Sequence, residues 1–323
     1  MTFFDFNPYA SPFLNVDKQI NHLYERNYFP YDSITESDRH MLGEINFHRF
    51  LGYVQNFEIL HNQRLIDAPK VPSQVFKIID IDTQVSALLY KGIRNAEILL
   101  RHYTVKHYCE KYPASNYFLE PSNLLNLGSG YSNEILTMGL ANDIFRCREK
   151  CVVNIIKNNC IKLGKKVPKK SYAIDGSTMQ KILEGVPLWS VVDSFSLGHL
   201  SEFVIRCDAD SDPKEHIWRR VAEEIDFKPD RFQRGLDSLR SLRNLVSHHA
   251  RIWMRPTTYS MPKKGLFRKE IANADPRSMI IAFYNLASFQ GAKSRKEFAK
   301  ELQTILDQDP TYKIGVSYLN KKR

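Results

Sequence analysis

One segment holds the residues best suited to chemistry, and it reads RSLRNLVSHHAR from Arg240 to Arg251. In a helix, Arg240, Asn244 and His248 share one face because they lie four residues apart. Arg243 precedes His248 by five residues, which in an ideal helix is about 140° around the axis and roughly 7.5 Å along it. An arginine side chain is long enough to cross that angle, so Arg243 and His248 can address one phosphate from two sides.

These residue types fit the chemistry of a phosphodiester. Histidine titrates near neutral pH, so His248 can take a proton from a ribose oxygen or return one. The guanidinium of Arg243 stays charged and can hold phosphorane oxygens with a forked set of donors. Asn244 can fix the histidine or bind a phosphate oxygen. The same residues can also serve the fold alone, by capping carbonyls or completing a polar network in the core, and the R-x-x-x-x-H spacing does not decide between these roles.

The second histidine, His249, lies on a different face of the expected helix from His248. It falls on the apolar side of the expected helix, together with Leu242, Leu245 and Val246. We therefore predict that His249 is a core histidine or supports the site from behind.

Positive charge gathers around this segment. Residues 231–270 hold ten Lys or Arg against Asp237 and Glu270, while the whole chain of 323 residues carries a net charge of +10. A helix crowded in this way repels itself unless something anionic offsets the charge, so the sequence predicts a phosphate-bearing partner. A solvated basic face is the alternative. The candidate RNA contacts are Arg240, Arg251, Arg255, Lys263, Lys264, Arg268 and Lys269.

Composition and motifs argue against several classes of protein. The nearest approach to a glycine-rich phosphate loop, Gly128-Ser129-Gly130, stops short of both common forms, so no nucleotide cofactor is expected. The five cysteines form no C-x-x-C pair and their number is odd, which predicts free thiols, no metal site and a reducing compartment. The sequence shows neither a secretory signal pattern nor a membrane-length apolar run. We predict a cytoplasmic protein.

Apolar spacing predicts helices almost throughout, and strand-like alternation is nearly absent. The strongest patterns run from Thr83 to Tyr112 and from Asp230 to about Trp253. An acid-free run of lysines between 157 and 170 is interpreted as a solvated loop or a contact to a polyanion. The segment DAPKVPS at 67–73 resembles a linker, so we predict a small N-terminal helical module over 1–72 and a helical domain over 73–323. Further helices are expected near 16–28, 38–61, 188–206, 213–227, 276–289 and 294–306.

The residues around the motif resemble a known family. RNLVSHHARIW followed by Arg255-Pro256 is similar to the signature of the Abi-like proteins of bacterial abortive infection, the AbiD/AbiF group, whose fold belongs to the HEPN superfamily. Ser247, Met254 and Leu197 depart from the family pattern, and none of them removes a candidate catalytic side chain. Three more blocks resemble those of the family in the same order, and they lie at 17–53, 90–101 and 187–201.

The resemblance implies a fold, a reaction and an assembly. It implies an all-α, HEPN-type helical bundle and a metal-independent endoribonuclease, toxin-like and active in phage defence, in which Arg243 and His248 match the R-x(4–6)-H motif. HEPN ribonucleases generally build one composite site from two such motifs, and this chain has one, so a homodimer is expected. Glu97 and Arg101 match the family's Glu-x-x-x-Arg block. They would pack beside the motif helix, where Glu97 orients His248 or Arg243, or forms a purely structural ion pair.

The expected reaction is attack by the ribose 2′-oxygen on the adjacent phosphate, in single-stranded or loop RNA. The alternative from a different class is a non-catalytic RNA-binding or interaction module, held in complex with a partner RNA or protein. An antitoxin or regulatory RNA fits either hypothesis. The variant His248→Ala separates the two hypotheses. A nuclease should lose cleavage and still bind RNA, whereas a binding module should lose only affinity.

Overall fold

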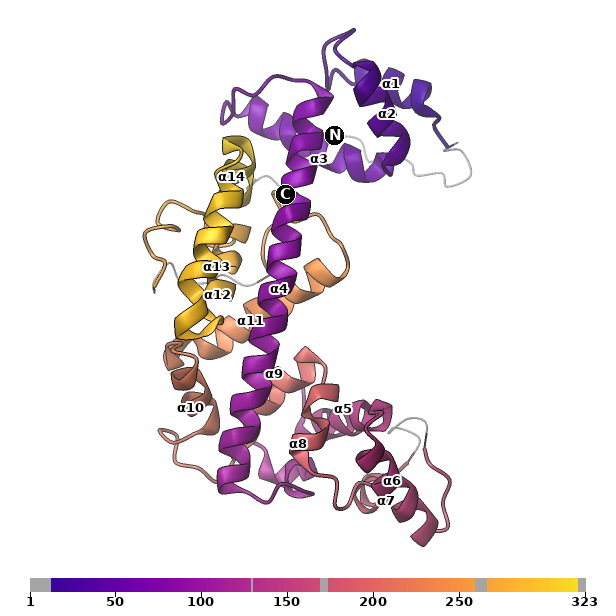
Figure 1. Cartoon of the computed structure of the whole chain (residues 1–323), viewed down its shortest axis with the longest axis vertical. Helices are drawn as coiled ribbons and strands as arrows, with labels where there is room; N and C mark the ends of the chain where they lie inside the picture. Colours follow the sequence, from indigo (N-terminus) through magenta and orange to yellow (C-terminus); the bar gives the residue numbers. More distant parts are fainter. Residues whose placement is uncertain (1–12, 129, 169–173, 259–265, 319–323) are drawn as a thin grey trace.

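The structure is a computed structural model that describes residues 13–128, 130–168, 174–258 and 266–318. These residues contain fourteen α-helices and no β-strand, so the predicted all-α class is confirmed. The molecule is elongated, with α1–α3 at one end, α5–α8 at the other, and one long helix, α4, connecting them (Figure 1).

The long helix α4 (Pro72–Lys111) has 40 residues and spans about 60 Å at 1.5 Å per residue. It begins eleven residues before the predicted start at Thr83. The apolar spacing continues back through Val75 and Ile78, both buried, and a proline is tolerated in the first turn of a helix. The predicted linker 67–73 therefore ends inside α4.

Of the N-terminal helices, α3 packs against α4, whereas α1 packs against α2. The stretch 38–61 was predicted as one helix, and this is wrong: Ile45 has extended backbone geometry, and Asn46 caps a new helix. The division into a module over 1–72 and a larger domain stays a prediction. The three helices of this segment are α1 (Val16–Glu25), α2 (Glu36–Glu44) and α3 (Phe47–Asn62).

The opposite end of the molecule contains helices that the apolar pattern did not predict. Three of them are α5 (Asn133–Arg146), α6 (Lys150–Lys162) and α7 (Gly176–Ile182). The lysine run interpreted as a loop begins inside α6, which buries Val152, Ile156 and Cys160 at four-residue spacing. The helix expected over 188–206 is broken into α8 (Leu188–Val191) and α9 (Leu197–Arg206), because Ser196 caps α9.

The remaining helices pack along α4. The helices predicted near 213–227, 276–289 and 294–306 are confirmed as α10 (Ile217–Glu224), α12 (Met279–Ser288) and α13 (Gly291–Leu306). A short C-terminal helix, α14 (Pro310–Ser317), was not predicted; it contacts α4, α12 and α13. All of these helices share one hydrophobic core with the N-terminal segment.

The motif helix is α11 (Pro229–Ser247), which begins with a proline in its first turn. It was expected to continue to Trp253, and this is wrong: His248 is the cap and His249 has a φ of 50°, in the left-handed region. The N–H of His249 donates to the Val246 carbonyl and that of Ala250 to the Leu245 carbonyl, at 3.1 and 3.0 Å. This pair of bonds is a Schellman turn, which ends a helix sharply.

The described residues contain neither a membrane-spanning helix nor a cluster of metal ligands. No described helix has the length and apolar content that a bilayer crossing requires. Within the same residues, no three His, Cys, Asp or Glu side chains gather as a metal site would need. The five cysteines are free, and Cys160 and Cys207 are buried.

Candidate active site

The motif helix α11 buries one face and leaves the other open. Phe232, Leu236, Leu239, Leu242 and Val246 are buried, at the three- and four-residue spacing of an amphipathic helix. This face packs against α4, α9, α10 and α12. The opposite face carries the predicted polar residues at the C-terminal end of the helix, where the chain turns away.

Glu97 lies between two arginines at the centre of this region. Its Oε1 atom is 3.8 Å from Nε of Arg243, and its Oε2 atom accepts a hydrogen bond from Nη1 of Arg101 at 3.0 Å. Arg101 also donates to the carbonyls of Val192 and Phe195, at 3.2 and 3.0 Å. Arg101 is therefore committed to the fold, whereas the Arg243 side chain is 38% exposed. The structure brings the predicted supporting pair, Glu97 and Arg101, against the predicted catalytic arginine.

The other two predicted catalytic residues lie on the open face. Asn244 is exposed, and its Oδ1 atom accepts a hydrogen bond from Nη1 of Arg243 at 3.3 Å. His248 is exposed at the C-cap, where its backbone N–H donates to the Asn244 carbonyl at 3.1 Å. Glu97 was expected to orient His248 or Arg243, and the contact in the structure is with Arg243. The arrangement offers a fixed cation and an exposed histidine about one and a half turns apart along one helix end.

The interpretation of His249 as a core histidine is wrong. The side chain is exposed, because the Schellman turn ends the helix before His249 and removes it from the apolar face. Its carbonyl accepts a hydrogen bond from Nη1 of Arg49, on α3, at 2.6 Å. Sequence reasoning missed Arg49, which is 200 residues away along the chain.

The predicted RNA contacts differ in their surroundings. Arg240 already pairs with two carboxylates, at 2.9 Å from Glu202 and 3.7 Å from Asp237. Arg251 lies over the ring of Tyr53 at 5.5 Å and next to Gly52, where a Cβ atom would be 2.2 Å from its Nη1 atom. Arg255, Arg268 and Lys269 are exposed, and Lys263 and Lys264 lie outside the described residues.

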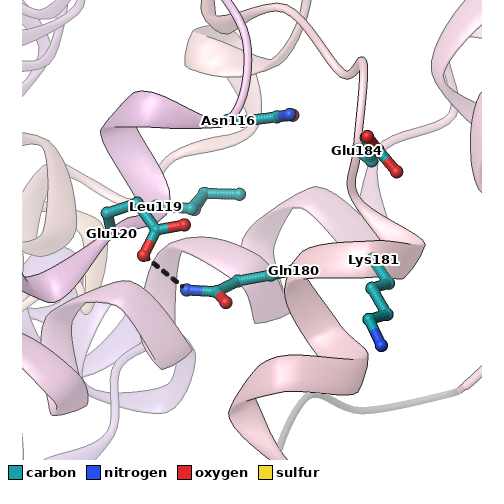
Figure 2. A pocket seen from close by; sticks show the side chains of 6 residues that line it. All are labelled: Asn116, Leu119, Glu120, Gln180, Lys181 and Glu184. Atoms are coloured by element: carbon teal, nitrogen blue, oxygen red, sulfur yellow. Dashed lines mark hydrogen bonds between the residues drawn. The ribbon is translucent and has the colours of Figure 1, made fainter.

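A cavity lies away from the motif helix, and its lining residues differ in type from those of the candidate active site. It has a volume of about 300 Å³ and lies beside η1 (Tyr117–Leu119) and α7 (Figure 2). Its lining mixes two glutamates with one lysine and amides, and Gln180 donates to Glu120 across it at 2.8 Å. None of the predicted catalytic residues lines this cavity. The candidate active site is an open surface at the end of α11.

The chain matches a known protein family. The family model described as Abi-like protein matches residues 40–254, a span that includes Glu97, Arg101 and the whole segment from Arg240 to Arg251. No curated protein and no solved structure matches the chain.

Proposed function

Because the chain belongs to the Abi-like protein family, we propose that it is a metal-independent endoribonuclease that cleaves single-stranded or loop RNA. The proposal includes membership of the AbiD/AbiF group and of the HEPN superfamily, which the four sequence blocks support. It includes a role in phage defence by abortive infection, in the cytoplasm.

The observation that carries the proposal is the position of Arg243. Its guanidinium is held by Glu97 and by Asn244, yet more than a third of the side chain remains open to solvent. A cation fixed in this way is prepared to receive the phosphate oxygens without reorganising. His248 lies at the end of the same helix, within reach of the same phosphate by the spacing argument.

The proposed step breaks one phosphodiester bond without a cofactor. A neutral histidine takes the proton of the ribose 2′-hydroxyl, and the 2′-oxygen attacks the adjacent phosphorus. The bond from phosphorus to the 5′-oxygen breaks, and a protonated histidine gives that oxygen its proton. The products are a 2′,3′-cyclic phosphate and a 5′-hydroxyl. Arg243 stabilises the negative charge that builds on the phosphate oxygens.

The reaction needs a proton acceptor and a proton donor on opposite sides of one phosphate. One chain supplies one R-x-x-x-x-H motif, so we propose that a homodimer supplies both histidines from its two copies of His248. A two-fold interface of this kind places each motif helix near its symmetry mate.

The second candidate function is a non-catalytic RNA-binding module. The open shape of the surface favours it, since an exposed cationic face binds RNA without cleaving it. Such a module would work in complex with a regulatory RNA or an antitoxin, and the nuclease can also be neutralised by such a partner.

The experiment that tests the nuclease is cleavage in the presence of excess EDTA. The purified protein is incubated with a single-stranded RNA, and the new ends are analysed. We expect cleavage to persist in EDTA and to leave 2′,3′-cyclic phosphate and 5′-hydroxyl ends. A strict requirement for a divalent metal, or a 3′-hydroxyl product, would count against the proposed step.

A further inference from the structure

The chain segment that follows the motif histidines is bound to a buried carboxylate on α4. Asp82 is 2% exposed and accepts four hydrogen bonds. Its Oδ1 atom accepts from the Tyr312 hydroxyl at 2.7 Å and from the Trp253 N–H at 3.1 Å. Its Oδ2 atom accepts from the Tyr53 hydroxyl at 2.5 Å and from the Ile252 N–H at 3.1 Å.

These four bonds fill the acceptor positions of a carboxylate, which has about four lone-pair sites. Burial raises the pKa of the Asp82 carboxyl, and the hydrogen bonds oppose that rise. Burial also raises the pKa of Tyr53 and of Tyr312, so both hydroxyls remain donors at neutral pH. An asparagine could not replace Asp82 here, because its amide nitrogen would face donors instead of accepting from them.

Trp253 is fixed by three further contacts. Its carbonyl accepts from Nδ2 of Asn56 at 3.3 Å, and its indole Nε1 donates to the Tyr312 carbonyl at 3.2 Å. The indole also lies against Gly315, where a Cβ atom would be 2.0 Å from Nε1. The segment after the motif is thus held by α3, α4 and α14 together.

This anchor lies close to His248 along the chain. Between His248 and Ile252 are three residues, and the first two complete the Schellman turn that ends α11. With the helix packed on one side and Ile252 and Trp253 fixed on the other, this short connection has little freedom. The carbonyl of His249 is fixed as well, by Arg49.

We propose that Asp82 is a positioning residue for His248, acting through the backbone of Ile252 and Trp253. The proposal rests on the proposed nuclease function, in which His248 exchanges protons with RNA. Asp82 is buried and does not touch the substrate. The buried N–H groups of Ile252 and Trp253 need acceptors, because an unpaired buried donor is costly. A single carbonyl or hydroxyl oxygen could accept from part of this set, whereas the two oxygens of a carboxylate accept from both N–H groups and from the two tyrosine hydroxyls. By binding the successive N–H groups of Ile252 and Trp253, the Asp82 carboxylate fixes the path of the backbone just after the motif helix.

The test compares Asp82→Asn and Tyr312→Phe with a matched control, Tyr284→Phe. Tyr284 is also buried and donates one hydrogen bond, to Gln303 at 2.8 Å, at a site that does not include the motif segment. Three quantities are measured: amide hydrogen exchange over residues 248–254, single-turnover cleavage at saturating RNA, and affinity for a 2′-O-methyl RNA that cannot be cleaved. Tyr312→Phe carries the test if Asp82→Asn does not fold.

We expect faster exchange over 248–254 in both variants, and a cleavage rate that falls about 10- to 100-fold in Asp82→Asn, since a displacement of about 1 Å can have that effect. Tyr312→Phe should show a smaller fall. RNA affinity should stay within about threefold of the wild type, because the cationic contacts remain. Tyr284→Phe should match the wild type in all three measurements.

Two results would overturn the positioning role. Exchange that is unchanged in both variants would mean that Asp82 does not hold the segment. Faster exchange with an unchanged cleavage rate would mean that the segment does not position His248. A third result, a wild-type protein that cleaves no RNA, would contradict the proposed function on which the positioning role rests.

Discussion

At the level of single residues, the carboxylate of Glu97 helps to hold the guanidinium of Arg243 in place. Replacing Glu97 by glutamine keeps its size and removes the charge that faces Arg243 and Arg101. Arg101 keeps its two carbonyl partners, so we expect the fold to persist. A half-exposed ion pair contributes about 1 kcal/mol or less, so the cleavage rate should fall by roughly two- to fivefold.

The measurement is single-turnover cleavage, with Glu58→Gln as the matched control. Glu58 is a partly buried carboxylate that pairs with Lys70 at 2.6 Å, away from α11. Equal rates for Glu97→Gln and the wild type would show that Glu97 serves only the fold.

The backbone of His249 gives a second prediction at this scale. Its φ of 50° suits glycine and disfavours a β-branched side chain. The free energy of unfolding of His249→Gly should therefore lie within about 1 kcal/mol of the wild-type value. That of His249→Val should be lower than the wild-type value by about 1–2 kcal/mol. Urea unfolding measures both. His249→Gly should also cleave RNA at the wild-type rate, and a clear loss of cleavage would instead make His249 part of the chemistry.

Prediction from sequence worked for some of these residues and not for others, for a physical reason. The Glu-x-x-x-Arg and R-x-x-x-x-H spacings are local, and the structure does bring Glu97, Arg101 and Arg243 together. Asp82 and Arg49 act on a segment about 170 and 200 residues away. Such long-range hydrogen bonds leave no local pattern in the sequence.

At the scale of elements, the charged segment after the motif helix is expected to bind phosphates. Arg268 and Lys269 are both exposed. If each contacts one phosphate, changing both to glutamine should make the slope of log affinity against log salt less steep by about 0.7 per contact. The matched control is the pair Lys296 and Lys300, exposed on α13. A salt dependence that is the same in both double variants would identify the basic segment as a solvated face.

Helix ends were harder to predict than helices. The three- and four-residue spacing identified α4 and α11, because tertiary burial follows the same period. The end of α11 was missed because a histidine, rather than the usual glycine, occupies the left-handed position of the Schellman turn. α6 was missed because lysines on its exposed face obscured Val152, Ile156 and Cys160.

At the scale of the whole molecule, His61 should make stability depend on pH. Burial lowers its pKa from the usual 6.5, and the charge of Lys70 adds to this. A lowered pKa means that the unfolded chain binds the proton more readily, so the stability from neutral His61 is present above about pH 6.5 and is lost as the pH falls. The free energy of unfolding should therefore fall between about pH 7.5 and about pH 5.5.

The same measurement on His61→Phe should show a smaller fall over this range. His40→Phe, at an exposed site on α2, serves as the control and should behave as the wild type. A pH dependence that is identical in all three proteins would assign the acid sensitivity to other groups.

The proposed composite site makes a prediction about subunits. Arg243→Ala chains and His248→Ala chains should each be inactive alone. When His248→Ala chains are mixed with wild-type chains and allowed to exchange, every mixed dimer keeps only one of the two histidines, so the cleavage rate per wild-type chain should fall. A monomer by light scattering that cleaves at the full rate would instead place the whole mechanism in one chain.

The role of His248 in cleavage is tested most sharply by measuring both RNA cleavage and RNA binding of the His248→Ala variant. Cleavage of a single-stranded RNA is followed in EDTA, and affinity is measured with the 2′-O-methyl form of the same RNA. We predict that His248→Ala cleaves about 100-fold more slowly or worse, while its affinity stays within about threefold of the wild type. His40→Ala, which removes an exposed histidine elsewhere, should cleave at the wild-type rate. Cleavage by His248→Ala at the wild-type rate would show that His248 takes no part in the reaction.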